Sequence, residues 1–221
     1  MGGLSFAILV VGAGASTRMG FDKTWAELGG QPLLAYALDA ARQAAPAEVV
    51  LVVAEDRLAH ARALAPEARV VAGGARRRDS VGNGIAVTTA SWVAIHDAAR
   101  AFAPSSLFAA GLKAAQPSGA AIPILPVKDT IKQVRDGYVL GTLPRAEHVI
   151  VQTPQVFRRD LLERALASAQ VDVTDESTLV ESLGVRVATF AGDERAFKLT
   201  TPLDFAFAQT LFAAGAGAAP G

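Results

Sequence analysis

The chain has 221 residues, 51% of them hydrophobic, and its 21 Lys and Arg residues balance its 21 Asp and Glu residues to a net charge of zero. That balance argues against a broadly basic nucleic-acid surface or a polybasic membrane patch. The absence of cysteine excludes disulfides, a thiolate zinc site and a cysteine nucleophile, and three histidines disfavour a metal cage built by protein alone.

The length suits one large domain, so we expect residues 1–221 to form a single domain. No apolar stretch approaches the ~20 residues of a membrane helix, and the N-terminus lacks a basic region followed by an apolar secretory segment. We therefore expect a cytoplasmic protein.

The first apolar run, residues 5–11, leads into a loop of small residues that ends in two cations, Gly12-Ala13-Gly14-Ala15-Ser16-Thr17-Arg18-Met19-Gly20-Phe21-Asp22-Lys23. Small residues let backbone N–H groups approach phosphate oxygens, and Arg18 and Lys23 can neutralise the charge. The loop matches neither a Walker A loop nor a dinucleotide fingerprint. It indicates phosphate binding of another kind, with a plain chain turn as the alternative.

Short apolar strands alternate with helix-like segments through the first half of the chain. We predict strands at 5–11, 49–53, 92–95 and 120–127, and helices at 33–45, 58–64, 80–89 and 105–114. This pattern is typical of a parallel sheet covered on both faces, which binds ligands at the carboxyl ends of its strands. We therefore expect an α/β fold with a mostly parallel central sheet and its site at that edge.

A second loop, Gly73-Gly74-Ala75-Arg76-Arg77-Arg78-Asp79-Ser80, follows the apolar pair Val70-Val71. It joins a flexible turn to a helix start, where Asp79 or Ser80 is a candidate N-cap. Reading of a nucleotide base by this loop is a hypothesis that the residues alone do not support.

The third loop is His96-Asp97-Ala98-Ala99-Arg100, directly after the strand at 92–95. A carboxylate and a guanidinium at a strand end suit contact of Asp97 with a ribose or a metal and of Arg100 with an acidic group. A local ion pair between Asp97 and Arg100 is an equally good interpretation.

Beyond residue 127 the pattern changes to a β-hairpin with a turn at Asp136-Gly137. The hairpin is apolar, so we expect an arm at about 130–150 that pairs with a second copy in a homodimer. We further predict helices at 159–168, 175–183 and 202–213, a strand at 186–190 and a disordered tail at 213–221.

Seven blocks in this order resemble the 2-C-methyl-D-erythritol 4-phosphate cytidylyltransferase family over nearly the whole chain. They are Gly12-Ala13-Gly14 with Arg18-Met19-Gly20 and Lys23; Gly73-Gly74 with Arg77 and Ser80-Val81; His96-Asp97-Ala98-Ala99-Arg100; Pro126-Val127-Lys128-Asp129-Thr130-Ile131-Lys132; Thr153-Pro154-Gln155-Val156-Phe157; Thr174-Asp175-Glu176; and Lys198-Leu199-Thr200. The ordered series is specific, although many nucleotidyltransferases share the first block.

The resemblance implies a Rossmann-like three-layer nucleotidyltransferase fold that moves a cytidylyl group from CTP to methylerythritol phosphate and releases pyrophosphate, with Mg²⁺ on the triphosphate. The attacking phosphate is already an anion, so the reaction needs no nucleophilic side chain. It needs cations that hold two anions together and stabilise charge on the α-phosphate.

The resemblance also implies a role for each matching residue. Arg18, Lys23, Arg145 and Lys198 would be catalytic; Gly12, Ala13, Gly14, Ser16, Gly74, Ala75, Ser80, Asp97 and Ala98 would bind the nucleotide; Arg100, Thr130, Arg145, Thr153, Thr174 and Lys198 would bind the acceptor; and Asp97 would face the metal. Arg145 would reach the neighbouring subunit's site. Without the resemblance, Lys198 would be taken for a solvated lysine and Arg145 for half of a surface salt bridge.

The chain departs from the family pattern at Gly12, where alanine is usual, and at Ser16, where glycine is common. Ala75 stands where an acidic residue often follows Gly-Gly, Ala101 replaces a common proline, and the spacing to Lys23 is short. Alternatives are a cytidylyltransferase for another polyol phosphate such as ribitol 5-phosphate, a pterin-cofactor nucleotidyltransferase, and a non-catalytic CTP-binding module.

Overall fold

The computed structural model describes residues 5–14, 22–168, 173 and 175–215. The elements are β1 (Phe6–Gly12), η1 (Lys23–Trp25), β2 (Glu27–Leu28), β3 (Gln31–Pro32), α1 (Leu33–Gln43), β4 (Glu48–Val53), η2 (Glu55–Arg57), α2 (Leu58–Leu64), β5 (Arg69–Ala72), α3 (Arg77–Ile85), β6 (Trp92–Asp97), α4 (Ser106–Ala115), β7 (Ala120–Pro126), β8 (Ile131–Arg135), β9 (Tyr138–Leu143), η3 (Arg145–Glu147), β10 (Val149–Val151), β11 (Gln155–Arg158), α5 (Arg159–Ser168), α6 (Glu176–Ser182), β12 (Ala188–Ala191), η4 (Glu194–Ala196) and α7 (Pro202–Ala213).

The central sheet has eight strands, in the order β10-β7-β11-β6-β1-β4-β5, with β12 parallel to β7. Strand β1 lies between β4 and β6 and is parallel to both, while β11 is antiparallel to its neighbours β6 and β7. The expected mostly parallel sheet is therefore confirmed. Its parallel strands end together, so the loops after β1, β4, β5 and β6 meet at one edge.

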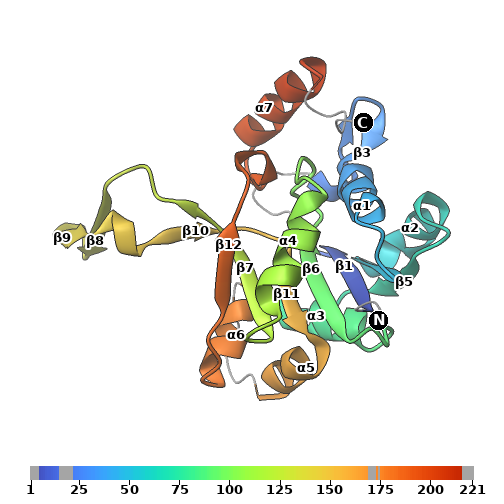
Figure 1. Ribbon diagram of the computed structural model, residues 1–221. Coiled ribbons are helices and arrows are strands. Elements are labelled where there is room, and N and C mark those ends of the chain that lie inside the picture. Colours follow the sequence, from blue (N-terminus) through green and yellow to red (C-terminus); the bar gives the residue numbers. More distant parts are fainter. Residues whose placement is uncertain (1–4, 15–21, 169–172, 174, 216–221) are drawn as a thin grey trace.

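Helices cover both faces of the sheet (Figure 1). Alternate residues of β1 point to opposite faces: Ile8 and Val10 pack with α1, α2 and α4, whereas Ala7 and Leu9 pack with α3, α5 and α6. All four side chains are fully buried. Because both faces are covered, β1 is apolar from Phe6 to Val11, and burial of each large aliphatic side chain contributes about 1.5–3 kcal/mol.

Helix α3 begins three residues earlier than predicted. Its N-cap is Arg76, and Asp79 is the third residue of the helix, where its Oδ2 accepts a hydrogen bond from the Arg76 N–H at 3.2 Å. The prediction that Asp79 or Ser80 is the N-cap is therefore wrong. Asp79 still satisfies the backbone at the helix start, but from the position of the acidic residue in a capping box.

Strands β8 and β9 pair as an antiparallel hairpin that projects from the body of the molecule (Figure 1). Asp136 and Gly137 have φ values of 51° and 82°, which match the left-handed geometry that a two-residue hairpin turn requires. The turn prediction is thus confirmed. Helix α7 ends at Ala213 as predicted, and residues 216–221 of the proposed tail lie outside the described residues.

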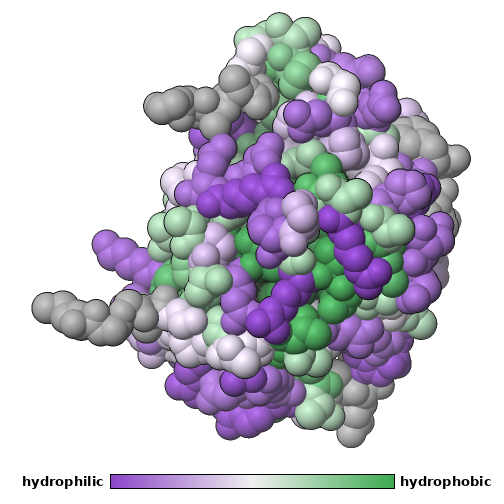
Figure 2. Space-filling model, turned by 90° about the vertical axis from the view of Figure 1, so that its right-hand side faces the viewer, coloured by the Kyte–Doolittle hydropathy of each residue, from purple (hydrophilic) through white to green (hydrophobic). Residues whose placement is uncertain are grey.

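The side of the molecule that carries α2 and β5 shows hydrophobic residues at its centre, surrounded and crossed by hydrophilic ones (Figure 2). This mixture fits a sheet edge, since the side chains of β5 are only partly buried or exposed. Within the described ranges, no helix is both long and apolar enough to cross a membrane.

Candidate active site

The loops after β1, β5 and β6 lie in close contact at the carboxyl edge of the sheet. Val11 is opposite Asp97 in the register of β1 and β6, and the Ala98 N–H donates to the Val11 carbonyl at 3.0 Å. A Cβ on Gly73 would lie 2.2 Å from the Cβ of Ala13. Glycine at 73 therefore lets the first two loops approach each other.

Gly12 is equally confined, because a Cβ there would lie 2.9 Å from Cγ2 of Thr24 and 3.1 Å from Cβ of Ala98. An alanine at position 12 would need the space that the methyl group of Thr24 already occupies, so glycine suits the packing at this position.

The first loop is described only at its ends. Ala13 and Gly14 follow β1, and Lys23 begins η1, where its Nζ donates to the Leu199 carbonyl at 2.9 Å. Ser16 and Arg18 lie outside the described residues. Their roles stay predictions.

Ser80 fixes the conformation of the second loop and is not the N-cap of α3. The buried Ser80 hydroxyl accepts a hydrogen bond from the Gly74 N–H at 3.0 Å, while Gly74 and Ala75 are exposed. A Cβ on Gly74 would lie 2.4 Å from Cβ of Asp79. The loop is therefore folded tightly onto the first turn of α3, with its backbone open to a ligand.

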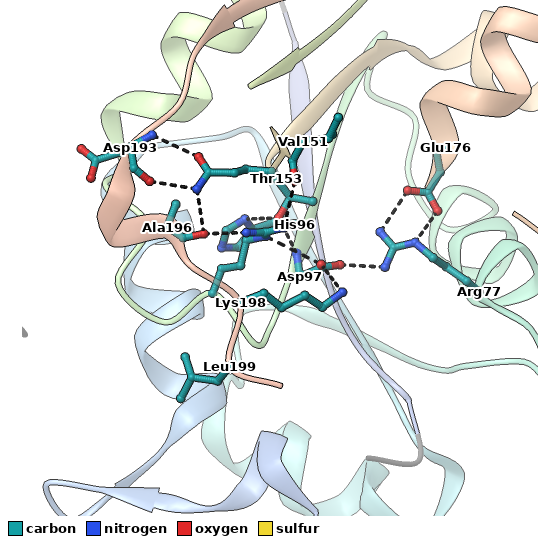
Figure 3. A network of polar contacts seen from close by, with 12 residues as sticks. Arg77, His96, Asp97, Val151, Thr153, Glu176, Asp193, Ala196, Lys198 and Leu199 are labelled. Carbon is teal, nitrogen blue, oxygen red and sulfur yellow. Dashed lines mark hydrogen bonds and ion pairs between the residues drawn. The ribbon is translucent and has the colours of Figure 1, made fainter. Parts of the chain in front are cut away.

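Asp97, the last residue of β6, is the centre of the site (Figure 3). Its Oδ1 lies 2.7 Å from Nη1 of Arg77 and its Oδ2 lies 2.8 Å from Nζ of Lys198. Burial acts to raise the pKa of Asp97, but the cations Arg77, Lys198 and Arg100 lower it by more than burial raises it. The pKa of Asp97 therefore lies well below its ordinary value. Asp97 is therefore a buried carboxylate that is ionised near pH 7.

Lys198 and Lys23 are brought to this edge by one short segment. The Leu199 N–H donates to the Ala99 carbonyl at 2.9 Å, and the Leu199 carbonyl accepts from Lys23. Directly after it, the Asp204 carboxylate caps α7 by accepting from the N–H groups of Thr200 and Thr201 at 2.7 and 2.8 Å. Lys198 is paired with Asp97, so it is not the solvated surface lysine of the alternative interpretation.

The side chain of Thr153 holds the backbone of Asp97. Its Oγ1 accepts from the Asp97 N–H at 3.0 Å and lies 3.2 Å from Nδ1 of His96. Burial lowers the pKa of His96 to about 4, so the ring is neutral near pH 7 and can accept the threonine proton. Thr153 is buried, and its predicted contact with the acceptor stays a prediction.

Arg100 is mostly engaged by backbone. Nη1 donates to the Ala196 carbonyl at 2.6 Å, Nη2 donates to the Val151 carbonyl at 3.4 Å, and Nε lies 3.8 Å from Oδ2 of Asp97. Burial lowers its pKa, which Asp97 partly opposes. The structure thus contains the long Asp97–Arg100 contact, while an acceptor contact of Arg100 stays a prediction.

Thr130 and Arg145 lie on or beside the arm. Both are exposed, and Nη1 of Arg145 donates to the Lys128 carbonyl at 2.8 Å. The structure does not bring either residue among the side chains around Asp97 that Figure 3 shows. Thr174 lies outside the described residues.

Two charged residues of the site carried no predicted role, although both belong to the quoted motifs. These residues are Glu176 and Arg77. The fully buried Glu176 carboxylate accepts hydrogen bonds from Nε and Nη2 of Arg77 at 2.8 and 3.0 Å, and Nη1 of Arg77 donates to Asp97. Burial and its two carboxylates act in opposite directions on Arg77, and the carboxylates hold its pKa above the ordinary value. The sequence signal for a role of Arg77 and Glu176 in the site was that each belongs to one of the motif blocks.

The described part of the chain has no group of three or more His, Cys, Asp or Glu side chains that could hold a metal ion. Asp97 is the carboxylate at the centre of the site, and cationic side chains surround it. Such an arrangement suits binding and positioning of anions more than acid–base or covalent chemistry.

Comparison with known proteins gives one consistent result. The family model for 2-C-methyl-D-erythritol 4-phosphate cytidylyltransferase matches residues 6–214. A protein of that name from Rhodococcus jostii is 45% identical over 215 residues, covering 94% of this chain and 95% of the relative.

Solved structures agree with the sequence comparison. The 2-C-methyl-D-erythritol 4-phosphate cytidylyltransferase of Thermus thermophilus has a TM-score of 0.79 at 35% identity, covering 95% of this chain and 98% of that one. The 4-diphosphocytidyl-2C-methyl-D-erythritol synthase of Anaerococcus prevotii has a TM-score of 0.84 at 26% identity, with the same coverage. The three-layer nucleotidyltransferase fold is confirmed.

Proposed function

The chain belongs to the family of 2-C-methyl-D-erythritol 4-phosphate cytidylyltransferases, and on this premise we propose how its own residues carry the reaction. The enzyme transfers a cytidylyl group from CTP to 2-C-methyl-D-erythritol 4-phosphate and releases pyrophosphate. The observation that carries the mechanism is that one segment, residues 198–199, brings Lys198 to Asp97 and holds Lys23 beside it.

The acceptor phosphate attacks the α-phosphorus of CTP in line with the leaving pyrophosphate. Its own oxygen is the nucleophile, so no side chain forms a covalent bond. Lys198 binds the acceptor phosphate, and Lys23, together with Arg18, stabilises charge on the α-phosphate and the pyrophosphate. These contacts strengthen as charge moves toward the leaving group, which is the condition for lowering the barrier.

Nucleotide binding falls to the two small-residue loops. The backbone of Gly12, Ala13 and Gly14, extended by Ser16, binds the triphosphate, and Gly74, Ala75 and Ser80 line the cytosine pocket. The open backbone at 74–75, fixed by Ser80, supports this assignment. Asp97 and Ala98 lie by the ribose.

The residues present fit one Mg²⁺ ion shared with the substrate. Mg²⁺ in nucleotide sites is held by one or two carboxylates together with phosphate oxygens, and Asp97 offers one ionised carboxylate whose second oxygen faces the half-exposed Lys198. Asp97 and the triphosphate would hold the ion. When bound, it would neutralise phosphate charge and orient the triphosphate for attack.

We also propose a homodimer formed through the arm. Large apolar side chains are exposed along it: Val134 57%, Tyr138 77%, Val139 62%, Leu140 53%, Val149 44% and Ile150 53%. An exposed two-stranded hairpin this apolar needs a partner. Arg145 and Thr130 on the arm would then reach the acceptor in the partner's site, with Arg100, Thr153 and Thr174 completing the acceptor pocket.

The test is release of pyrophosphate by the purified protein with Mg²⁺ and CTP. The acceptors are methylerythritol phosphate, ribitol 5-phosphate and a blank, and the reaction is repeated with ATP, GTP and UTP. We expect release only with CTP and methylerythritol phosphate. Release with ribitol 5-phosphate instead would reassign the acceptor, and CTP binding without release would favour a binding module. A cytoplasmic location stays a prediction.

A further inference from the structure

The ion pairs around Asp97 form a chain of alternating charge, Glu176–Arg77–Asp97–Lys198, that joins α6, α3, the end of β6 and the segment before α7 (Figure 3). The proposed function gives Asp97 and Lys198 a role but none to Arg77 or Glu176. Glu176 is fully buried, and the Arg77 side chain is 21% exposed. A pair this deep inside the protein requires its own explanation.

Each of the three guanidinium nitrogens of Arg77 donates to a carboxylate. Nε and Nη2 donate to the two oxygens of Glu176 at 2.8 and 3.0 Å, and Nη1 donates to Oδ1 of Asp97 at 2.7 Å. The bidentate contact fixes the plane of the guanidinium, and that plane fixes the Asp97 carboxylate. Of these two partners only Asp97 has a role in the proposed reaction, so Asp97 is the group through which Arg77 can act on it.

Asp97 divides its oxygens between two cations of different exposure. Oδ1 of Asp97 pairs with Arg77, whereas Oδ2 pairs with Lys198, whose side chain is 38% exposed. Arg100 is more distant, with Nε 3.8 Å from Oδ2. If Lys198 turns toward an anionic phosphate, Arg77 remains the closest cationic side chain to Asp97 in the described residues. Without such a partner, a buried carboxylate is strongly unfavourable.

We infer that Arg77, anchored by Glu176, is a positioning residue that orients Asp97 and keeps it neutralised, so that Lys198 can exchange Asp97 for the acceptor phosphate. The inference rests on the proposed function. Without Arg77, Lys198 is the closest cationic side chain left to Asp97 in the described part of the chain, and it stays bound to this carboxylate. The expected cost falls on the use of the acceptor.

A double-mutant cycle between Arg77 and Asp97 tests this. All proteins carry Glu176→Gln, so that Arg77→Met does not leave the buried Glu176 as a carboxylate without its partner. In that background Arg77→Met should lower kcat/KM for methylerythritol phosphate about 10- to 100-fold, as when a group that orients a functional side chain is lost. With Asp97→Asn also present, the same change should cost less than about threefold, because the group through which Arg77 acts is already neutral.

Arg42 provides a matched control, since it bridges Asp39 and Glu67 at 2.9 and 2.7 Å on the outer side of α1. Arg42→Met should leave kcat/KM unchanged within about twofold. Arg77→Lys keeps a single charge near Asp97 without the bidentate contact, so it should recover at least about threefold over Arg77→Met. This second variant decides the matter if Arg77→Met does not fold.

Equal losses from Arg77→Met in both backgrounds would mean that the arginine only ties α3 to α6, and would overturn the inference while the wild-type enzyme remains active. A failure of Arg77→Lys to recover activity would count against it in the same way. An inactive wild-type enzyme in this assay would overturn the proposed function, and the inference with it.

Discussion

Protonation of His96 should destabilise the fold, because its imidazole is fully buried against Phe108 and its Nδ1 meets the Thr153 hydroxyl that supports Asp97. Burial lowers the pKa of His96 from 6.5 to about 4. A pKa that is lower in the folded state means that the unfolded chain binds more protons between these values. The contribution of His96 to the free energy of unfolding is then fully present above about pH 6.5, and it is lost as the pH falls from there to about pH 4.

The size of the effect follows from the two pKa values. A shift of one unit corresponds to about 1.4 kcal/mol, so the change from 6.5 to about 4 corresponds to roughly 3 kcal/mol in total. About 2 kcal/mol of this should be lost between pH 7 and pH 4.5. This is a large fraction of the stability of an ordinary domain.

Urea unfolding of the wild-type protein and of His96→Asn at several pH values from 7 to 4.5 measures this directly. Asparagine keeps a hydrogen-bonding group near the Nδ1 position but does not titrate, so the variant should be less stable at pH 7 yet lose less on acidification. Glu176, whose pKa is raised by burial, acts in the opposite direction and is present in both proteins. Parallel curves would refute a neutral, buried His96.

Further substitutions test other parts of the site. Lys23→Ala should lower kcat far more than it raises KM for CTP, and an unchanged kcat in steady-state kinetics would remove Lys23 from the mechanism. Arg145→Ala should weaken use of the acceptor and leave CTP binding, measured by calorimetry, intact. Mixed dimers of Arg145→Ala and Lys23→Ala subunits should regain activity, and no recovery in such dimers would contradict sharing of the site between subunits. Gly12→Ala should lower Tm by several degrees, and Thr24→Ser should restore part of the loss by removing the methyl group 2.9 Å from the added Cβ; no recovery would contradict that packing account.

The position of the site was predictable from strand chemistry. Apolar strands followed by small-residue loops predicted a parallel sheet with ligands at its carboxyl edge, and Gly73 and Asp97 lie there. The predicted helices at 58–64, 159–168 and 202–213 match the observed bounds of α2, α5 and α7. Strand β11 was not predicted, since its four residues follow a Thr-Pro pair and show no distinguishing pattern.

The partners of the charged residues were not predictable from the sequence. Arg77 and Glu176 are 99 residues apart, and their contact depends on how α3 and α6 pack on the same face of the sheet. Arg100 was expected to meet an acidic group, yet two of its nitrogens donate to backbone carbonyls that reach it only in the folded chain. Motifs identified these residues, while only the fold assigns their contacts.

The most direct test of the account follows oxygen from the acceptor phosphate into the product. Methylerythritol phosphate carrying oxygen-18 in its phosphate is converted with unlabelled CTP and Mg²⁺, and both products are analysed by mass spectrometry. If the acceptor phosphate attacks the α-phosphorus, all label stays in the cytidyl diphosphate product and the pyrophosphate is unlabelled. Label in the pyrophosphate, or no labelled diphosphate product, would contradict the account.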